Sequence, residues 1–170
     1  MNFFDADRWK YTSVLKHHHH LLCDEFRQFN ESEWVNNNQK YIGTQGGWYF
    51  IPFIGKSVSY DQYLNRCPTV QSLLKQVPIF DNCVFSIMGP QSEIEPHRGH
   101  SDGHLRVHLT LITDGTAYIK VGDDTKWWHE REVLIFQDYE EHSTKNPSDS
   151  TRVVFLFDIK REDYFNNLIG

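Results

Sequence analysis

The sequence lacks several features that would assign it to a particular class of protein. It has only three cysteines, Cys23, Cys67 and Cys83, an odd number without CxxC spacing, so a disulfide framework is not expected. We expect three buried thiols in a reducing compartment, the cytoplasm. No apolar run approaches the ~18 residues of a membrane-spanning helix. The first residues have neither the basic nor the apolar region of a signal peptide, so the sequence predicts no membrane partner.

An excess of positive charge is also missing. The formal net charge is −6, which argues against nucleic acid as a partner. Internal repeats and a Pro/Gly/Ser-rich linker are absent as well. A length of 170 residues therefore predicts one domain, 1–170, large enough for a proper core. We expect a helical or mixed portion, about residues 1–80, packed on a β-rich core, about residues 81–160.

The first portion shows two helical patterns. Apolar residues fit a helix loosely from Ser13 to Phe29. Thr69–Val77 fits better, because its apolar residues follow the i, i+3, i+4, i+7 spacing and prolines lie at both ends. Trp48–Ile51 is typical of a strand and is expected to end at Pro52.

Short strand-like segments separated by turn residues dominate the second portion. Five or more such strands predict an all-β barrel or a double-sheet jelly roll with the helices packed outside. The segments are Cys83–Met88, Leu105–Ile112, Tyr118–Val121, Glu132–Phe136 and Arg152–Ile159.

Charged residues occur on strands that should be buried. In Leu105–Leu111 the leucines and valine alternate with Arg106, His108 and Thr110, so these polar side chains share the second face of the strand. This face is either wet or turned into a barrel, where Arg106 and His108 would need an anionic partner. Arg152 opens an apolar strand and is expected at a barrel mouth, aimed at a carboxylate or phosphate.

Two isolated histidines, His97 and His142, precede the strands that carry Arg106 and Arg152. They could meet across a barrel mouth and bind iron, zinc, copper or nickel, although a single such histidine is more often only a polar residue. A rival zinc cluster, His97, His100, His104 and His108, has helical spacing, but nearby proline and glycines disfavour a helix there. The run His17–His20 is interpreted as part of a solvated helix face.

Together these residues resemble the aspartyl/asparaginyl β-hydroxylase family of iron(II)- and 2-oxoglutarate-dependent oxygenases. The likeness depends on order and spacing from about Phe85 to Asp158, and it implies a double-stranded β-helix (jelly roll, cupin-like) with flanking helices. The matching residues are Phe85–Met88, Pro96-His97-x-Gly99, Leu105-Arg106-x-His108-Leu109, Trp128, Val133–Phe136, Asp138, Glu141-His142 and Arg152.

The resemblance implies a role for each matching position. His97 and His142 would bind Fe(II). Arg152, with the hydroxyl of Ser86, would bind the distal carboxylate of the cosubstrate 2-oxoglutarate, and O2 would be the oxidant. His108 would lie against the cosubstrate near the metal. Arg106 would face the cosubstrate or a substrate carboxylate.

The chain departs from most 2-oxoglutarate oxygenases at Gly99, where an acidic third ligand usually stands two residues after the first histidine. The resembled family shares this departure and has water in the vacant place. Asp102 is a poor substitute because it follows His97 by five residues. His104 stands where β-hydroxylases often have an arginine, which weakens the implied preference for aspartyl or asparaginyl residues.

Three polar residues, Gln137, Asp138 and Glu141, are candidates to orient His142. The expected reaction is hydroxylation of a C–H bond, at the β-carbon of an Asp/Asn-like residue or a related acid. The substrate could be a peptide, a carrier-tethered or free amino acid, or an acyl chain. We expect specificity to lie in the first half and in the segment Glu93–Gly103. The sequence leaves the oligomeric state open.

Two alternatives belong to other classes of protein. One is a non-catalytic jelly-roll module that binds a metal or a small anion. The other is a zinc-binding, cupin-like isomerase or hydrolase, which would explain two histidines but not Arg152 together with Ser86.

Overall fold

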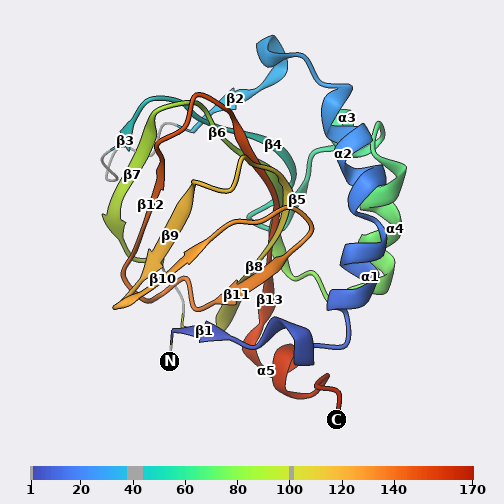
Figure 1. The fold of residues 1–170 in the computed structure, drawn as a ribbon. Coiled ribbons are helices and arrows are strands. Elements are labelled where there is room, and N and C mark those ends of the chain that lie inside the picture. Colours follow the sequence, from blue (N-terminus) through green and yellow to red (C-terminus); the bar gives the residue numbers. More distant parts are fainter. Residues whose placement is uncertain (1, 38–43, 100–101) are drawn as a thin grey trace.

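Two antiparallel sheets face each other and form a jelly roll, with helices packed on one side (Figure 1). The computed structural model describes residues 2–37, 44–99 and 102–170. The larger sheet has the strand order β1-β11-β8-β13-β6-β4-β2, with β5 paired to β4, and the smaller sheet has the order β10-β9-β12-β7-β3. The expected jelly roll with external helices is therefore confirmed.

The strands of the larger sheet are β1 (Phe3–Phe4), β2 (Val35–Asn36), β4 (Trp48–Gly55), β5 (Val58–Ser59), β6 (Asp81–Met88), β8 (His104–Ile112), β11 (Val133–Phe136) and β13 (Arg152–Lys160). Those of the smaller sheet are β3 (Thr44–Gln45), β7 (Ser92–His97), β9 (Tyr118–Val121), β10 (Asp124–Trp127) and β12 (His142–Asn146). The helices are α1 (Thr12–His17), α2 (His19–Arg27), α3 (Asp61–Leu64), α4 (Pro68–Gln76) and α5 (Arg161–Phe165), with 3-10 turns η1 (Ala6–Arg8) and η2 (Glu31–Glu33).

The larger sheet is buried on both faces, and each face has its own apolar core. The outer face packs against α1, α2 and α4, with residues such as Leu22, Val70 and Phe155 in one cluster. The inner face turns toward the smaller sheet, with Trp128 and Phe136 among a second cluster between the sheets. Because successive side chains of a strand point to opposite faces, every second residue of β8 and β13 enters the barrel.

The helices of the first portion differ in detail from the expectation. The pattern over Ser13–Phe29 forms two helices rather than one, since the helix is interrupted at His18. The His18 ring nitrogen Nδ1 lies 2.7 Å from the carbonyl oxygen of Val14, which a continuous helix uses for its own backbone. The helix expected over Thr69–Val77 is present as α4 and has Pro68 in its first turn.

The strands also differ in two ways. β4 does not end at Pro52 but continues to Gly55, because a register shift between Pro52 and Ile54 accommodates the residue without an N–H. The second difference is that β7, β10 and β12 were not predicted, nor were the two-residue strands β1, β2, β3 and β5. β12 has the sequence His-Ser-Thr-Lys-Asn, whose buried residues are polar, so it has no apolar alternation to reveal it.

Strands from the first 80 residues enter the same sheet as the β-rich portion, because β4 pairs with β6 along most of its length. The three cysteines are free and buried, as expected. Among the described residues, no helix is both long enough and apolar enough to cross a membrane.

Candidate active site

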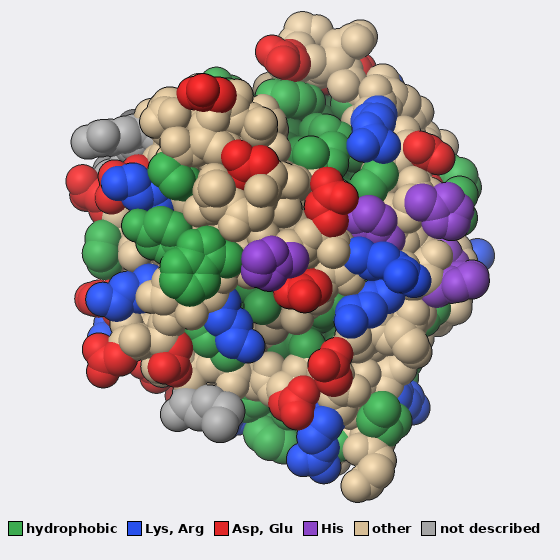
Figure 2. All heavy atoms as spheres, in the orientation of Figure 1, with side chains coloured by type: hydrophobic (Ala, Val, Ile, Leu, Met, Phe, Trp, Pro, Cys, Tyr) green, Lys and Arg blue, Asp and Glu red, His purple; other side chains and the backbone are tan. Residues whose placement is uncertain are grey.

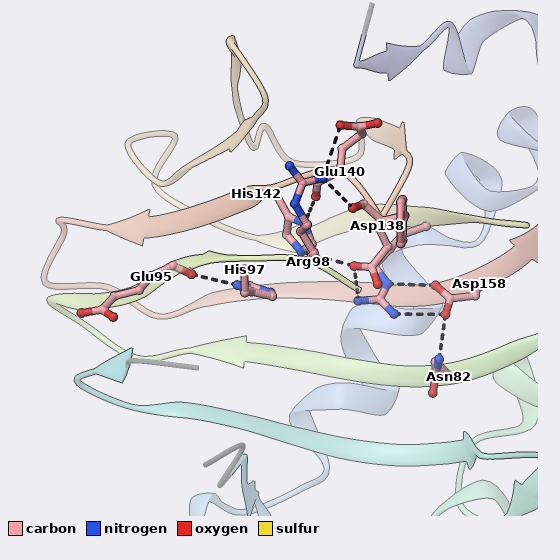
Figure 3. A network of polar contacts seen from close by, with 10 residues as sticks. Asn82, Glu95, His97, Arg98, Asp138, Glu140, His142 and Asp158 are labelled. Carbon is pink, nitrogen blue, oxygen red and sulfur yellow. Dashed lines mark hydrogen bonds and ion pairs between the residues drawn. The ribbon is translucent and has the colours of Figure 1, made fainter. Parts of the chain in front are cut away.

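His97 and His142 meet between the sheets, at the adjoining ends of β7 and β12. They are register partners, and their ring centroids lie 4.2 Å apart. Each Nδ1 atom lies within hydrogen-bond distance of the carbonyl oxygen two residues earlier, 2.8 Å from Glu95 and 2.7 Å from Glu140 (Figure 3). A carbonyl can only accept, so each Nδ1 carries the proton and each Nε2 keeps its lone pair. In the neutral rings both Nε2 atoms can bind a metal ion, and Nε2 of His142 also faces Oδ1 of Asp138.

Asp138 lies against this pair of histidines. Its Oδ1 is 3.2 Å from Nε2 of His142 and 2.8 Å from Nη1 of Arg106. A Cβ atom on Gly99 would overlap Oδ2 of Asp138. Burial alone would raise the pKa of Asp138, but Arg106 and the histidines outweigh it and hold that pKa below its usual range. The ionised carboxylate thus occupies the space that an acidic side chain at position 99 would need.

Arg106 is held by two protein carboxylates. Its Nε and Nη2 donate to Asp158 at 2.8 and 3.0 Å, and Nη1 donates to Asp138 at 2.8 Å. Asp158 also accepts from Asn82 at 2.7 Å (Figure 3). Burial disfavours the cation, but the two carboxylates raise the pKa of Arg106 above its ordinary value. Arg106 was expected to face the cosubstrate or a substrate carboxylate; its donors instead bind Asp138 and Asp158.

Arg152 has no comparable partner. It is only 3% exposed, inside the barrel and not at a mouth as expected. Its Nη2 donates to the hydroxyl of Ser86 at 3.1 Å and to the Ser86 carbonyl at 3.2 Å, while Nε is buried without a partner. None of the described carboxylates lies within ion-pair distance. Burial lowers the pKa of Arg152 to about 9, because the cation has lost water and gained no anion.

His108 offers a second unsatisfied donor. Its Nδ1 accepts a hydrogen bond from Nε1 of Trp128 at 3.2 Å, so the proton of the neutral ring is on Nε2. That Nε2 is buried and has no partner. Burial, with Arg152 nearby, lowers the pKa of His108 well below its ordinary value. The neutral ring thus presents an N–H to the barrel interior.

Ring contacts connect the two ends of the site. Phe136 lies 5.6 Å from the ring of His142 and 5.1 Å from that of His108. Trp128 lies 6.0 Å from His108, and the Arg152 guanidinium is 4.5 Å from the Trp128 ring. The histidine pair and the unpaired cation therefore belong to one apolar-walled interior, in which an anion would be attracted and water excluded.

These donors fit the groups that the sequence implies. An unpaired guanidinium beside a serine hydroxyl and an imidazole N–H suits a carboxylate of 2-oxoglutarate. Within the described ranges no three histidine, cysteine, aspartate or glutamate side chains form a metal site. Fe(II) held here would thus have His97 and His142 as its protein ligands. Burial lowers the pKa of His97, which favours the neutral form that a metal needs.

Several other candidates lie apart from this interior. Gln137 accepts from Arg161 at 2.7 Å and does not contact His142, and Glu141 is exposed. Asp138 alone of the three proposed orienting residues reaches the ring. Of the rival zinc cluster, His100 lies outside the described residues. Asp102 has an exposed side chain.

The histidine run lies on the other side of the larger sheet. Figure 2 shows histidine side chains gathered over α1 and α2. His17 and His20 are exposed, whereas Nε2 of His19 lies 3.1 Å from the carbonyl oxygen of Leu111. The segment Glu93–Gly103, expected to be a specificity loop, is strand β7 as far as His97, and residues 100–101 lie outside the described ranges.

Sequence comparison assigns the chain to a family. Residues 13–162 match the Aspartyl/Asparaginyl beta-hydroxylase family. The chain belongs to this family. The match spans both sheets and includes every residue of the site described above, so the resemblance that the sequence motifs indicate is confirmed.

Curated relatives of the family are similar over large parts of this chain. An "ornithine lipid ester-linked acyl 2-hydroxylase" from Rhizobium tropici is 32% identical over 127 residues, which are 73% of this chain and 45% of that protein. The human "aspartyl/asparaginyl beta-hydroxylase" is 34% identical over 104 residues, 56% of this chain and 14% of that protein. Human "aspartate beta-hydroxylase domain-containing protein 2" is 27% identical over 171 residues, which cover 92% of this chain and 46% of that protein. The chain thus spans less than half the length of these relatives.

Solved structures support the fold. A prolyl hydroxylase from Trichoplax adhaerens, in complex with a hypoxia-inducible-factor peptide, superposes with a TM-score of 0.54 at 14% identity, covering 90% of this chain and 81% of that one. A Pseudomonas putida prolyl-4-hydroxylase superposes with a TM-score of 0.51 at 16% identity, covering 91% of this chain and 90% of that one. At this identity the likeness shows the double-stranded β-helix alone.

Sequence reasoning missed Asp158 and Asn82, and it quoted Trp128 without a role. Asp158 has the same parity in β13 as Arg152, so it faces the barrel interior. A carboxylate on that face, opposite Arg106 in the neighbouring strand, was a signal for an internal ion pair. Nothing in the spacing indicates the hydrogen bond from Trp128 to His108.

Proposed function

We propose that this chain is an iron(II)- and 2-oxoglutarate-dependent oxygenase that hydroxylates a C–H bond, at the β-carbon of an Asp/Asn-like residue or a related acid. The observation that carries the proposal is Arg152, a buried guanidinium without a carboxylate, in the same interior as His97 and His142. A buried cation is unfavourable unless an anion accompanies it. A dicarboxylic cosubstrate would bring that anion.

Each residue of the interior then has a defined task. His97 and His142 hold Fe(II) through Nε2, and their Nδ1–H groups fix the ring orientations on the carbonyls of Glu95 and Glu140. Arg152 binds the distal carboxylate of 2-oxoglutarate with help from Ser86. When bound, Fe(II), 2-oxoglutarate and O2 supply the oxidation of an unactivated C–H bond.

The remaining polar residues position this set. His108 donates its Nε2–H to a cosubstrate oxygen and stays neutral, because a charged ring beside Arg152 would be repelled. Asp138 accepts from Arg106 and lies beside His142, and Asp158 holds Arg106 in turn. Arg106 is therefore a positioning residue in this proposal. The apolar walls of Phe136 and Trp128 exclude water from the reacting centre.

The test is an anaerobic titration of the metal-free protein with Fe(II) and then with 2-oxoglutarate, followed by visible absorption. We expect a weak metal-to-ligand charge-transfer band that needs both additions. The band should be lost in His142→Ala and retained in His129→Ala, since His129 is exposed and outside the interior. No band, together with tight zinc binding, would overturn the proposal in favour of a zinc-binding, cupin-like module.

Within this proposal the substrate is a peptide, a carrier-tethered or free amino acid, or an acyl chain. The names of the relatives cover both an acyl 2-hydroxylase and an aspartyl/asparaginyl hydroxylase, which is why the proposal includes both chemistries. A cytoplasmic location is also part of it, supported by three free, buried thiols.

A further inference from the structure

An open pocket of about 590 Å³ lies at the end of β8 and β13, beside α5. Gly103 and six side chains line it: His104, Lys160, Arg161, Glu162, Phe165 and Asn166. None of these residues takes part in the metal or cosubstrate site proposed above. A ligand bound in this pocket would therefore be separate from the proposed metal ion and cosubstrate.

The pocket combines the cations Lys160 and Arg161 with the ring of Phe165 and one carboxylate, Glu162, and the ring of Phe80 lies next to it. Lys160 lies 5.3 Å and the His104 ring 4.6 Å from the ring of Phe80, which is 40% exposed. The Arg161 guanidinium lies 5.5 Å from the ring of Phe165, which is 50% exposed. Throughout the described chain, no carboxylate lies within ion-pair distance of Lys160 or Arg161. Positive charge next to exposed apolar rings suits a ligand that is both anionic and apolar.

Strand register relates this pocket to the metal site. Along β8 and β13 the paired residues that face inward are Leu156 with His108, Asp158 with Arg106, and Lys160 with His104. Arg152 precedes these pairs at the start of β13. Since alternate residues share a face, His104 and Lys160 continue the surface that carries Arg106 and Asp158, ~7 Å further along the strands. Arg106 and Asp158, the pair next to the proposed metal histidines, thus lie between Arg152 and the pocket.

A hydrogen bond also connects the pocket with the site. Nη1 of Arg161 donates to Oε1 of Gln137 at 2.7 Å, and Gln137 immediately precedes Asp138, which contacts His142. The backbone N–H of Arg161 donates to the carbonyl of Gly103 at 2.9 Å, next to His104. An occupant of the pocket would therefore act on the segment that carries Asp138.

We propose that this pocket binds the acid group, a carboxylate or phosphate, of an amphiphilic substrate whose apolar part extends toward the metal. The inference rests on the proposed function and narrows its substrate to a molecule with an anionic group remote from the C–H bond that reacts. Cosubstrate and substrate then bind on opposite sides of the metal, with Arg152 at one end and Lys160 at the other. Phe80 and Phe165 contact the apolar part where it leaves the acid group.

The experiment uses decyl phosphate below its micellar concentration as the probe, on the full chain without metal, followed by amide NMR shifts. We expect saturable binding with the largest shifts at residues 103–104 and 160–166. Lys160→Gln should weaken binding about tenfold, the equivalent of about 1.4 kcal/mol, and Lys160→Arg should retain it. Lys75→Gln, on an exposed position of α4, is the matched control and should bind as the wild type does. Added salt should weaken binding.

Comparison probes decide the class of ligand. Inorganic phosphate and decyl maltoside should each bind much more weakly than decyl phosphate, because each lacks one half of the ligand. Phosphatidylglycerol vesicles, set against phosphatidylcholine vesicles, distinguish an acid lipid in a bilayer from a free acid amphiphile. Equal binding of inorganic phosphate, Lys160-dependent binding of hexaglutamate alone, or no effect of Lys160→Gln would each overturn the inference.

A second measurement separates this inference from the proposed function. In protein loaded anaerobically with Fe(II) and 2-oxoglutarate, decyl phosphate should shift the charge-transfer band, and Lys160→Gln should abolish the shift while leaving the band itself. A band without a shift overturns the inference only. Absence of the band overturns the proposed function, whatever the NMR titration of the metal-free protein gives.

Discussion

The backbone N–H of Gly99 donates to the carbonyl oxygen of Asp138 at 2.8 Å, and the Asp138 carboxylate fills the place of the missing Gly99 side chain. Two segments far apart in the sequence are thereby fixed against each other beside His97 and His142. Gly99 stands where an acidic ligand would follow His97. Because it has no side chain, the carboxylate of Asp138, from the segment between β11 and β12, can lie there. That carboxylate accepts from Arg106 and lies 3.2 Å from Nε2 of His142.

Gly99→Ala should destabilise the protein. The added Cβ overlaps Oδ2 of Asp138, so the carboxylate must move away from Arg106 and His142, and overpacking of this kind costs roughly 1–3 kcal/mol. Thermal unfolding of the metal-free protein measures the effect. Gly89→Ala is the control, because a Cβ there meets its nearest neighbour at an ordinary 3.6 Å. Equal melting temperatures for the two variants would contradict the prediction.

Arg152→Met should separate stability from cosubstrate binding. Removal of a buried cation without a carboxylate is expected to raise the free energy of unfolding of the metal-free protein by about 1 kcal/mol or more. The affinity for 2-oxoglutarate should fall about 100-fold, or ~2.7 kcal/mol, with Fe(II) binding retained. Denaturant unfolding and anaerobic titration measure the two effects. Arg27→Met, at an exposed position, should change neither, and a destabilised Arg152→Met protein would be evidence against the unpaired cation.

Asp158→Asn tests the ion pair that holds Arg106. The variant keeps the shape of the side chain but leaves a partly buried guanidinium with one carboxylate instead of two, and breaking a buried pair costs roughly 3 kcal/mol. Glu33→Gln is the matched control, because Glu33 also lies 2.7 Å from its arginine, Arg66, but at the surface. There the loss should be below about 1 kcal/mol. Similar losses in urea unfolding would show that burial of the inner pair has no special effect.

The stability of the metal-free protein should fall with acidification from pH 7.5 to 5.5. Burial places the pKa of His108 well below its ordinary value of 6.5. The unfolded chain therefore binds the extra proton below pH 6.5 and the folded protein does not, so stability decreases as pH falls. A histidine that stays neutral when folded contributes a loss of about 1.4 kcal/mol over this interval.

His108→Gln removes that titration while its amide oxygen can still accept from Trp128. Melting temperatures measured across the same pH interval should therefore fall less steeply for the variant than for the wild type. The control variant His129→Gln, at an exposed position outside the barrel interior, should have the wild-type slope. Parallel slopes for all three proteins would show that the pKa of His108 is the same in the folded and unfolded states.

Much of the fold was predictable because its main strands carry a clear pattern. β6, β8, β9, β11 and β13 were all recognised, since their apolar residues alternate or run continuously between turn residues. α4 was found from its spacing and its flanking prolines. β7 and β12, the strands that carry His97 and His142, were not recognised, since the inner positions of β12 are polar. The strand that carries His142 thus departs from a core pattern, whereas β8 and β13, which carry the arginines of the site, keep it.

The site was predictable in part. The alternation in β8 correctly separated Leu105, Val107 and Leu109 from Arg106 and His108, which face inward. The partner of Arg106 was not predictable. A buried arginine in the sequence indicates that an anion is needed, but it does not indicate which residue or ligand supplies it. Asp158 lies 52 residues away in sequence and supplies it. Arg152 carried the same signal in the sequence, yet its guanidinium has no protein carboxylate.

The sequence by itself determined the jelly roll, the inward polar face of β8 and the family, because alternation and motif spacing are local properties of the chain. Only the tertiary structure decided which arginine is neutralised and which is left for a ligand. The charges of Arg106 and Arg152 are the same in the sequence, and the neighbouring carboxylates are what distinguishes them. The fold places two carboxylates beside Arg106, Asp158 by strand register and Asp138 from the segment after β11. None of the described carboxylates lies within ion-pair distance of Arg152, and in a barrel interior of low polarity a cation without an anion is unfavourable.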